Sequence, residues 1–304
     1  MPTLRALTAI GTHQLAIITQ PDKPGGRGRH LLQTPVALAG TELNIPVIKT
    51  ASANELVGNM PIAHPDLFVV IAFGQKLSDD FIAASRLGAI NLHGSLLPKF
   101  RGAAPIQWSI LSGDAQAGVS VIQINSIMDG GAILAQRPTP IGPSETAGEL
   151  HDRLSQLGVA TVMDTIRQLE LGTANPQRQN PSEATPAPKL DRAMSWVDFT
   201  RPSNEVSCRI RGLSPWPGCR ASLVRANGND SVDLRLIKVV ADQPRNHQLP
   251  PGTFISSTDV ACGSGAVKLL TVQPNNRPVM SMADFLNGHK VQAGDKLVSV
   301  PPVG

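Results

Sequence analysis

The sequence contains no tyrosine, few aromatic residues of any kind and no long apolar stretch. Aromatic side chains make up 3% of its 304 residues. No apolar run approaches the roughly 18 to 20 residues that a membrane-spanning helix needs. Thr12, His13 and Gln14 are polar where the apolar part of a secretion signal would still continue. We therefore expect neither membrane insertion nor secretion.

Cysteine is also scarce. Cys208, Cys219 and Cys262 are odd in number and widely separated, and they form neither a CxxC metal motif nor the framework of a disulfide-rich domain. This pattern indicates reduced thiols that pack as small apolar side chains. It predicts a cytoplasmic location, and no spacing of histidine and cysteine predicts a bound metal.

Length and charge indicate two domains with different surfaces. A chain of 304 residues is long for one compact domain, and a hydrophobic content of 41% is adequate for packed cores. Residues 1–192 contain 15 basic and 15 acidic residues, whereas residues 193–304 contain 12 and 8. The net charge of +4 therefore comes from the last third. Such an excess only weakly favours a phosphate-bearing partner, because ordinary surfaces often show it too.

Short apolar segments alternate with helical patterns in the first half. The pattern predicts strands at 15–19, 67–72, 89–92 and 119–125, and helices at 2–9, 34–43, 78–84 and 104–111. This order is typical of an α/β domain with a doubly wound, mostly parallel, Rossmann-like sheet. A long helical region follows, with Thr146 and Glu149 as a capping pair, Gly158 as a point of division and Gly172 as the C-terminal cap.

The second half changes character after this helix. Several prolines among polar residues predict an extended linker at 172–192, between a catalytic domain at 1–171 and a second domain at 193–304. In the second domain we predict a small OB-like antiparallel β-barrel, with strands at 232–240, 252–256, 266–273 and 296–300.

The segment 90–98 gathers polar residues at the end of a predicted strand. Residues two apart in a strand project to the same side, so Asn91 and His93 should point together before Gly94 breaks the strand. Ligands of open α/β sheets bind just beyond the carboxyl ends of strands. An amide donor beside an imidazole suits stabilisation of an oxyanion on a carbonyl under attack.

Asp129 follows the predicted strand 119–125, so we expect it at a strand's carboxyl end as well. A carboxylate near His93 would favour the imidazolium and hold its orientation. Each feature alone is weak, because an isolated Asn-x-His is mostly structural and an isolated Asp-Gly-Gly is mostly a turn. Together they predict an oxyanion site without naming a substrate.

The joint motif resembles the folate-dependent formyltransferases. It consists of Asn91-Leu92-His93-Gly94-Ser95-Leu96-Leu97-Pro98, then Arg101-Gly102-Ala103-Ala104-Pro105, then Asp129-Gly130-Gly131. Further matching segments at 20–28, 215–218 and 283–288 extend the resemblance over nearly the whole chain. The resemblance is highly specific, although each segment alone is not.

The resemblance implies a reaction and a set of roles. The formyl group of 10-formyltetrahydrofolate would pass to the α-amino group of methionine on the initiator tRNA. Asn91 and protonated His93 would bind the oxyanion, while Asp129 would orient His93 and assist proton transfer through water. The residues implied to contact the folate donor are Ser95, Leu96, Leu97, Pro98, Ile71, Ala72, Phe73 and Gly74.

The cationic, glycine-rich loop at 20–29 would hold the tRNA acceptor end, through Lys23, Arg27 and Arg29. By composition alone this segment is an ordinary solvated loop. The barrel would add phosphate contacts from among Arg209, Arg211, Arg220 and Arg225. Trp216 is predicted to be a packing anchor, with a stacking platform for bases as the alternative. The chain is expected to act as a monomer.

Two alternatives stay open. One is a formyltransferase for a small amine, such as an amino sugar nucleotide or a purine precursor, which should lack the cationic loop and the Pro-Trp-Pro-Gly segment present at 215–218. The other is a non-enzymatic RNA-binding protein on a decayed transferase scaffold, which should have lost Asn91, His93 or Asp129.

One departure from the family pattern concerns the start of the chain. The family opens with a strand and a Gly-Thr-Pro loop before the helix represented here by residues 2–9. The first strand of a doubly wound sheet is usually interior. We therefore expect one interior strand to be missing, and a protein that begins about a dozen residues upstream.

Overall fold

The structure, a computed structural model, describes residues 1–25, 30–228, 231–242 and 247–300. Its contacts divide the chain into two compact units that alternate along the sequence. Unit 1 comprises residues 1–101, 118–138 and 153–185, and unit 2 comprises residues 102–117, 139–152 and 186–304. This division does not follow the domain bounds expected from the sequence, which stay a prediction.

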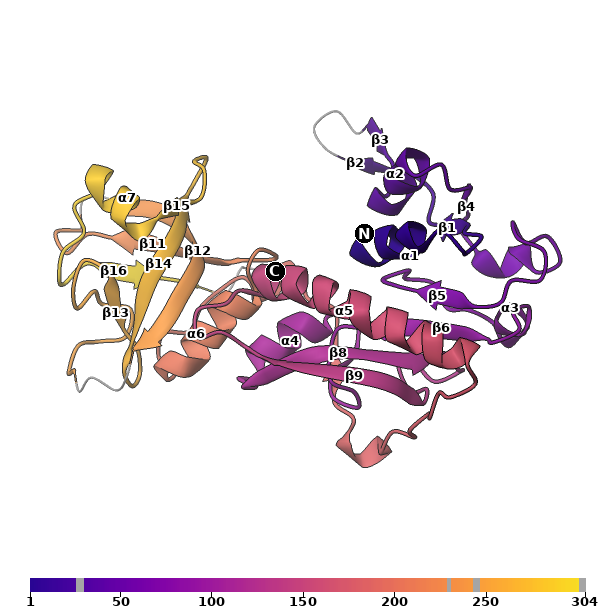
Figure 1. Cartoon of the computed structure of the whole chain (residues 1–304). Coiled ribbons are helices and arrows are strands. Elements are labelled where there is room, and N and C mark those ends of the chain that lie inside the picture. The colour runs from indigo at the N-terminus through magenta and orange to yellow at the C-terminus, as the bar shows by residue number, and fades with distance from the viewer. Residues whose placement is uncertain (26–29, 229–230, 243–246, 301–304) are drawn as a thin grey trace. The chain divides into compact units, whose positions relative to one another are not determined.

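Within the described ranges the elements are as follows (Figure 1). The α-helices are α1 (Pro2–Ile10), α2 (Pro35–Glu42), α3 (Asp79–Ala83), α4 (Pro105–Leu111), α5 (Ala147–Glu170), α6 (Ser203–Gly212) and α7 (Met282–Gly288). The strands are β1 (Ile17–Thr19), β2 (Lys23–Gly25), β3 (His30–Leu32), β4 (Val47–Lys49), β5 (Phe68–Val70), β6 (Ala89–His93), β7 (Arg101–Gly102), β8 (Gln116–Gln123), β9 (Ile133–Pro140), β10 (Pro186–Ala187), β11 (Cys219–Val224), β12 (Ser231–Asp242), β13 (Asp259–Ala261), β14 (Ala266–Pro274), β15 (Met280–Ser281) and β16 (Lys296–Val298).

Among the described residues, unit 1 contains three small sheets. One pairs β1 with β4 in parallel, one pairs β2 with β3 in antiparallel orientation, and the largest has the order β5-β6-β8-β9. The predicted parallel α/β arrangement is confirmed for β1 with β4 and for β5 with β6. β8, however, runs antiparallel to β6. Among the described residues no ladder joins β1 to β5, and the interior strand expected to be missing stays a prediction.

Helix α5 packs on the larger sheet of unit 1. Val162 and Ile166 on the helix form one buried cluster with Ile90 of β6 and Val121 of β8, and Figure 1 shows the helix running along these strands. A side chain at Gly158 would meet Leu92 of β6 at 2.6 Å, so glycine allows the helix to approach the sheet. The helix runs without a break from Ala147 to Glu170, so the predicted division at Gly158 is wrong.

The capping signals of α5 are confirmed. Thr146 Oγ1 accepts a hydrogen bond from the backbone N–H of Glu149, and the Glu149 carboxylate accepts one from the N–H of Thr146. At the other end Gly172 has φ +65°, the left-handed conformation that terminates many helices.

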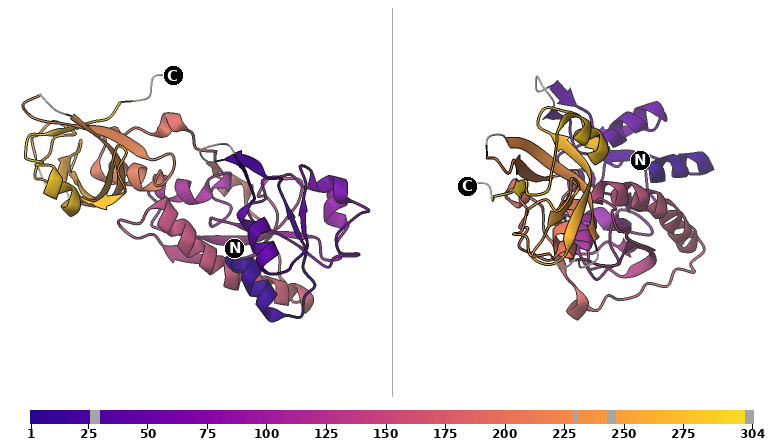
Figure 2. Two further views of the ribbon diagram at one scale, coloured as in Figure 1. Left: turned by 90° about the horizontal axis from the view of Figure 1, so that it is seen from above. Right: turned by 90° about the vertical axis from the view of Figure 1, so that its left-hand side faces the viewer.

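Unit 2 contains the predicted antiparallel barrel, whose strands are orange to yellow in Figure 2. Its strand order is β13-β14-β12-β11-β16, with β15 added to β14. Isolated bridges join Thr253 to Lys296 of β16 and Phe254 to Val260 of β13, so this short segment links the two outer strands. The interior is apolar and includes the fully buried Phe254. The expected strand at 252–256 is thus wrong as a strand, because these residues form only single bridges.

Sequence reasoning missed several strands, namely β2, β3, β4, β7, β9, β10, β11, β13 and β15. Apart from β9 and β11, these strands have two or three residues each, too few to show a period. No helix in the described ranges combines the length and the apolar character needed to cross a bilayer.

Candidate active site

Strand β6 carries the central polar pair. Asn91 is paired with Val70 of β5 and with Ile122 of β8, and His93 is paired with Ser120 of β8. Alternate residues of a strand share a face, so the two side chains project to the same side. His93 is buried, whereas the side-chain amide of Asn91 makes no hydrogen bond within the described part of the chain. That amide is free to donate to a ligand.

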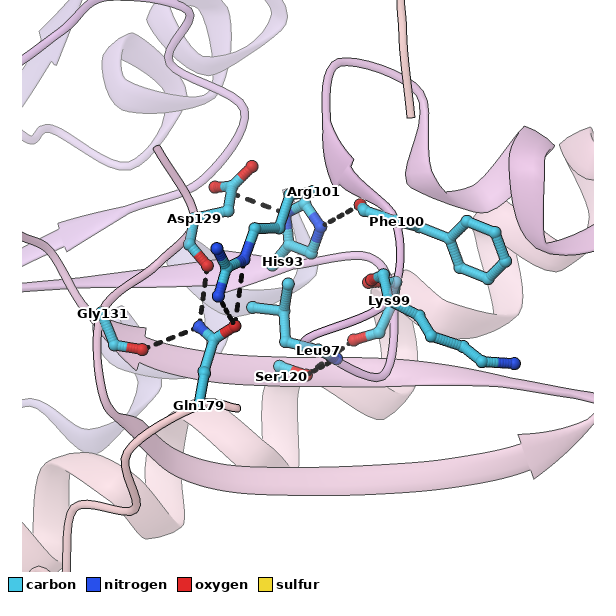
Figure 3. A network of polar contacts seen from close by, with 10 residues as sticks. His93, Leu97, Lys99, Phe100, Arg101, Ser120, Asp129, Gly131 and Gln179 are labelled. Carbon is cyan, nitrogen blue, oxygen red and sulfur yellow. Dashed lines mark hydrogen bonds and ion pairs between the residues drawn. The ribbon is translucent and has the colours of Figure 1, made fainter. Parts of the chain in front are cut away.

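The two ring nitrogens of His93 have different partners (Figure 3). Nε2 lies 2.9 Å from the carbonyl oxygen of Phe100, and Nδ1 lies 3.6 Å from Oδ1 of Asp129. A carbonyl only accepts, so Nε2 carries a proton. The His93 ring is therefore held between Phe100 and Asp129, with an oxygen facing each of its nitrogens.

Asp129 reaches His93 by a different route from the one the sequence predicted. Because β8 is antiparallel to β6, its carboxyl end lies beside Ile90, at the start of β6, rather than beside His93 at the end. The connection from β8 to β9 then folds back until the Asp129 carboxylate stands near the ring. Asp129 does follow the carboxyl end of β8, as expected, but this end lies at the edge of the sheet where β6 begins and not where it ends.

The loop around Asp129 leaves little room for change. Asp129 has φ +51°, a left-handed conformation that is uncommon outside glycine. A Cβ on Gly131 would stand 1.7 Å from the backbone oxygen of Gln123, so only glycine fits at that position. The loop is thus closed tightly against the end of β8.

Gln179 bonds to this loop, and sequence reasoning missed it. Its Nε2 donates to the carbonyl oxygens of Asp129 at 2.7 Å and Gly131 at 2.8 Å. Its Oε1 accepts from Nε of Arg101 at 3.1 Å and from Nη2 of Arg101 at 2.7 Å (Figure 3). The surrounding residues have the composition of a linker, and nothing in their spacing indicates a contact with Asp129.

The turn after His93 is held by internal hydrogen bonds. Ser95 is completely buried, and its hydroxyl donates to the carbonyl of Lys99 at 2.6 Å. Ser120 Oγ donates to the carbonyl of Ser95 at 2.6 Å and accepts from the N–H of Leu97 at 3.0 Å. Ser95 and Leu97 therefore support the turn from inside, and Leu96 and Pro98 lie partly exposed beside them. Their predicted contact with the donor stays a prediction.

Residues 71–74 follow β5 directly, next to Asn91 on β6. Ile71, Ala72 and Gly74 are exposed, and the carbonyl of Phe73 accepts a hydrogen bond from Nε2 of Gln20. The Phe73 ring packs against a buried cluster centred on Leu77 and Phe81. The predicted donor residues on β5 and β6 thus lie at adjacent strand ends.

An open cavity of about 510 Å³ adjoins the Asp129 loop in unit 1. Its apolar wall includes Ile82, Leu87, Ala89 and Ile124, and its polar wall includes Gln123, Asn125, Arg178 and Gln179. None of the residues predicted to bind the donor lines it. Phe73 packs against the same cluster as Ile82 and Ile124, which connects the predicted set to the cavity wall.

The residues predicted to bind tRNA are only partly described. Lys23 is exposed on β2, in a hairpin with β3, whereas Arg27 and Arg29 lie outside the described residues. Of the barrel arginines, Arg211 is buried and donates to the carbonyl of Glu145, so its predicted phosphate contact is wrong. Arg220 is exposed.

The other two barrel arginines are bonded within the protein. Arg209 donates to the carbonyls of Met194 and Trp196, and Arg225 pairs with Asp295. Trp216, expected to be a packing anchor, is 49% exposed. Its role, as a packing anchor or as a stacking platform, stays a prediction.

Comparison with known proteins defines the class. Residues 5–166 match the family model for formyl transferases, and residues 189–290 match the model for the formyl transferase C-terminal domain. The chain belongs to the formyl transferase family. Its relatives include the methionyl-tRNA formyltransferase of Methylococcus capsulatus, 37% identical over 302 residues that cover 98% of this chain and 96% of the relative. That of Gluconobacter oxydans is also 37% identical, over 305 residues covering 98% and 96%.

Solved structures share the fold at lower identity. An N-formyltransferase from Helicobacter canadensis, in complex with folinic acid and dTDP-3-aminofucose, aligns with a TM-score of 0.63 and 17% identity over 88% of this chain and 94% of that one. HypX from Aquifex aeolicus, in complex with tetrahydrofolic acid, aligns with a TM-score of 0.57 and 16% identity over 90% of this chain and 47% of that one.

Proposed function

We propose that the chain transfers the formyl group of 10-formyltetrahydrofolate to the α-amino group of methionyl-initiator tRNA. The observation that carries the proposal is the group formed by Asn91, His93 and Asp129, with His93 Nδ1 3.6 Å from Asp129 Oδ1. The full-length similarity to methionyl-tRNA formyltransferases supports the acceptor. The small-amine alternative rests on neighbours that are similar in fold alone.

In the proposed reaction the amine nitrogen attacks the formyl carbon, and the carbonyl oxygen gains negative charge. The Asn91 amide donates to that oxygen from the side of β6 it shares with His93. Both ring nitrogens of His93 already face a partner, Nε2 the carbonyl of Phe100 and Nδ1 the carboxylate of Asp129, so in this proposal the ring acts on the oxyanion through its positive charge and the Asn91 amide is the direct donor. The Asp129 carboxylate stabilises the imidazolium.

The protons and bonds balance in the second half of the reaction. The attacking amine loses a proton, which Asp129 accepts through water. The bond from the formyl carbon to N10 of the folate then breaks, and N10 takes this proton from Asp129 through water as the carbonyl re-forms. The products are tetrahydrofolate and formylmethionyl-tRNA.

The cavity beside the Asp129 loop fits the fused ring of the folate donor. Ile82, Ala89 and Ile124 offer an apolar wall to a flat ring, and the Gln123 and Asn125 amides can both donate and accept hydrogen bonds.

For the acceptor, we propose phosphate contacts from Lys23, Arg27, Arg29 and Arg220, and stacking on Trp216. Removing one phosphate contact should weaken tRNA binding and lower the slope of its salt dependence by about one. We expect this for Arg220→Ala and not for Arg211→Lys, whose side chain is buried. An unchanged slope in Arg220→Ala would remove that residue from the interface.

The test of the function is direct. The protein is incubated with 10-formyltetrahydrofolate and methionyl-tRNA, and formylmethionine is measured after hydrolysis of the ester. Parallel reactions offer an amino sugar nucleotide or an aminated purine precursor instead. We expect formylated product only in the reaction that contains methionyl-tRNA. Turnover of a small amine alone would favour the other transferase, and tRNA binding without turnover would favour the non-enzymatic alternative. Sedimentation would check the predicted monomer.

A further inference from the structure

The two partners of the His93 ring both sit on irregular backbone. Asp129 belongs to the β8–β9 connection and Phe100 to the turn after β6. Each has a positive φ, +51° for Asp129 and +62° for Phe100, which a residue other than glycine adopts only when its surroundings hold it there. Something outside these two turns must therefore keep His93 between its partners.

One segment contacts both turns. Backbone hydrogen bonds of 2.8 Å in both directions join Gln177 to Ile133 of β9. Two residues further on, Gln179 donates to the carbonyls of Asp129 and Gly131. At the far end the hydroxyl of Thr185 accepts from the N–H of Phe100 at 2.9 Å. Residues 177–185 thus bridge the two sides of the ring.

The amide of Gln179 is fully used by these contacts. Arg101 can only donate, so it fixes Oε1 on its own side and turns the NH₂ group towards the two carbonyls. Both hydrogens and both lone pairs are then engaged. Although Gln179 lines the cavity, its amide has no hydrogen-bonding capacity left for a ligand.

We propose that Gln179, oriented by Arg101, and Thr185 are positioning residues that hold Asp129 and Phe100 on the two nitrogens of His93. This inference rests on the proposed function, because it assigns these residues to the same reaction. They act through Asp129 and Phe100 and do not touch the substrate. The segment expected from the sequence to be a spacer is, in this account, part of the active site.

Kinetics with matched variants test the proposal. Gln179→Glu keeps an acceptor for Arg101 but puts a carboxylate oxygen against the carbonyls of Asp129 and Gly131. It should therefore break the contact with the Asp129 loop while a side chain of the same size remains. We expect kcat to fall on the order of 10- to 100-fold in Gln179→Glu and Gln179→Ala, with an unchanged Kd for 10-formyltetrahydrofolate. The control is Gln177→Ala, whose side chain bonds, among the residues that the structure describes, only to the carbonyl of Asn175, and it should behave as wild type. A raised Kd with normal kcat would overturn the proposal, because Gln179 would then contact the donor.

Two further comparisons separate positioning from general stability. Thr185→Val removes the acceptor at constant shape and should lower kcat, whereas Thr185→Ser keeps the hydroxyl and should restore it. In an Asp129→Asn background, Gln179→Ala should lower kcat by less than about twofold, because its effect acts through Asp129. A full additional loss in that background would overturn the assignment.

Hydrogen exchange tests the bridge by a readout that does not depend on enzyme activity. Amides of residues 124–131 should exchange faster in Gln179→Ala and Gln179→Glu than in wild type or Gln177→Ala. If wild type shows no formyl transfer, the proposed function fails while faster exchange still supports the bridge. Unchanged exchange together with unchanged kcat would refute the bridge alone.

Discussion

The barrel of unit 2 and the His93 centre of unit 1 are held together by different interactions. The barrel surrounds a large apolar cluster that includes Phe254 and Phe285. At the His93 centre the contacts are polar, and many end on backbone carbonyls, such as those of Phe100 and Asp129. Substitutions in the barrel should therefore lower stability at constant chemistry. Substitutions at the centre should lower the rate at nearly constant stability.

The largest expected loss of stability follows from removing a buried charge in unit 2. The Asp295 side chain is completely buried, pairs with Arg225 at 3.1 Å and accepts from the N–H of Ala226 at 2.9 Å. Asp295→Ala leaves Arg225 without its charged partner and should lower the free energy of unfolding by about 3–5 kcal/mol. Urea denaturation measures it. Normal stability would show that the pair is dispensable.

The same carboxylate gives the barrel an acid dependence. Burial raises the pKa of Asp295, but hydrogen bonds from Ala226, Gln292 and Arg225 outweigh burial, and the pKa lies below its ordinary value. The stabilisation is therefore present above the unfolded pKa of about 3.9 and is lost as the pH falls through the folded pKa. The stability difference between wild type and Asp295→Asn should shrink in acid. A constant difference would contradict this origin.

In unit 1, a substitution that adds a single methyl group should lower activity by more than its effect on stability explains. Gly131→Ala forces the Asp129 loop away from the oxygen of Gln123. We expect a stability loss of about 1–3 kcal/mol, together with a kcat lower than that loss of folded protein explains. The comparison is kcat per folded molecule, with folding followed by circular dichroism. If activity fell only in proportion to the amount of folded protein, Gly131 would matter for stability alone.

The reactivity of the three thiols of unit 2 should show how tightly the residues around each of them are packed. Burial raises the pKa of Cys219 and of Cys262 to about 12, and it raises the pKa of the half-buried Cys208 as well. Because the thiolate is the reacting form, Cys208 should react first with a disulfide reagent and the other two only on unfolding. Early labelling of Cys219 or Cys262, located by mass spectrometry, would show a looser barrel than described.

The smallest effect is expected at the surface of unit 2. Arg201, just before α6, forms an ion pair with Glu205 on that helix, and both side chains are largely exposed. Glu205→Gln should change the free energy of unfolding by less than about 0.5 kcal/mol. A change comparable to that of Asp295→Ala would mean that exposure does not distinguish the two pairs.

The sequence predicted the parts of the site that have a local cause. Asn91 and His93 share a face because strand geometry alternates, and this needs no knowledge of the rest of the chain. The direction of β8 is different, because strand order and direction depend on partners far along the chain. The sequence therefore indicated that Asp129 follows a strand, but not that this strand runs antiparallel to β6.

Gln179 could not be predicted for a related reason. Its neighbours are prolines and polar residues, a composition typical of a spacer, and its partners Arg101 and Asp129 are distant in sequence. Arg211 shows the same limit, since its sequence context carries no signal that it is buried on α6. Long-range hydrogen bonds decided both cases.

Formyl transfer by an Asp129→Asn variant tests the central claim most directly. The substitution keeps the shape of the side chain and removes the charge beside Nδ1 of His93. We predict that formation of formylmethionyl-tRNA falls on the order of 10²–10³-fold in kcat, with an unfolding transition like that of wild type. Turnover near the wild-type rate in the folded variant would contradict the account.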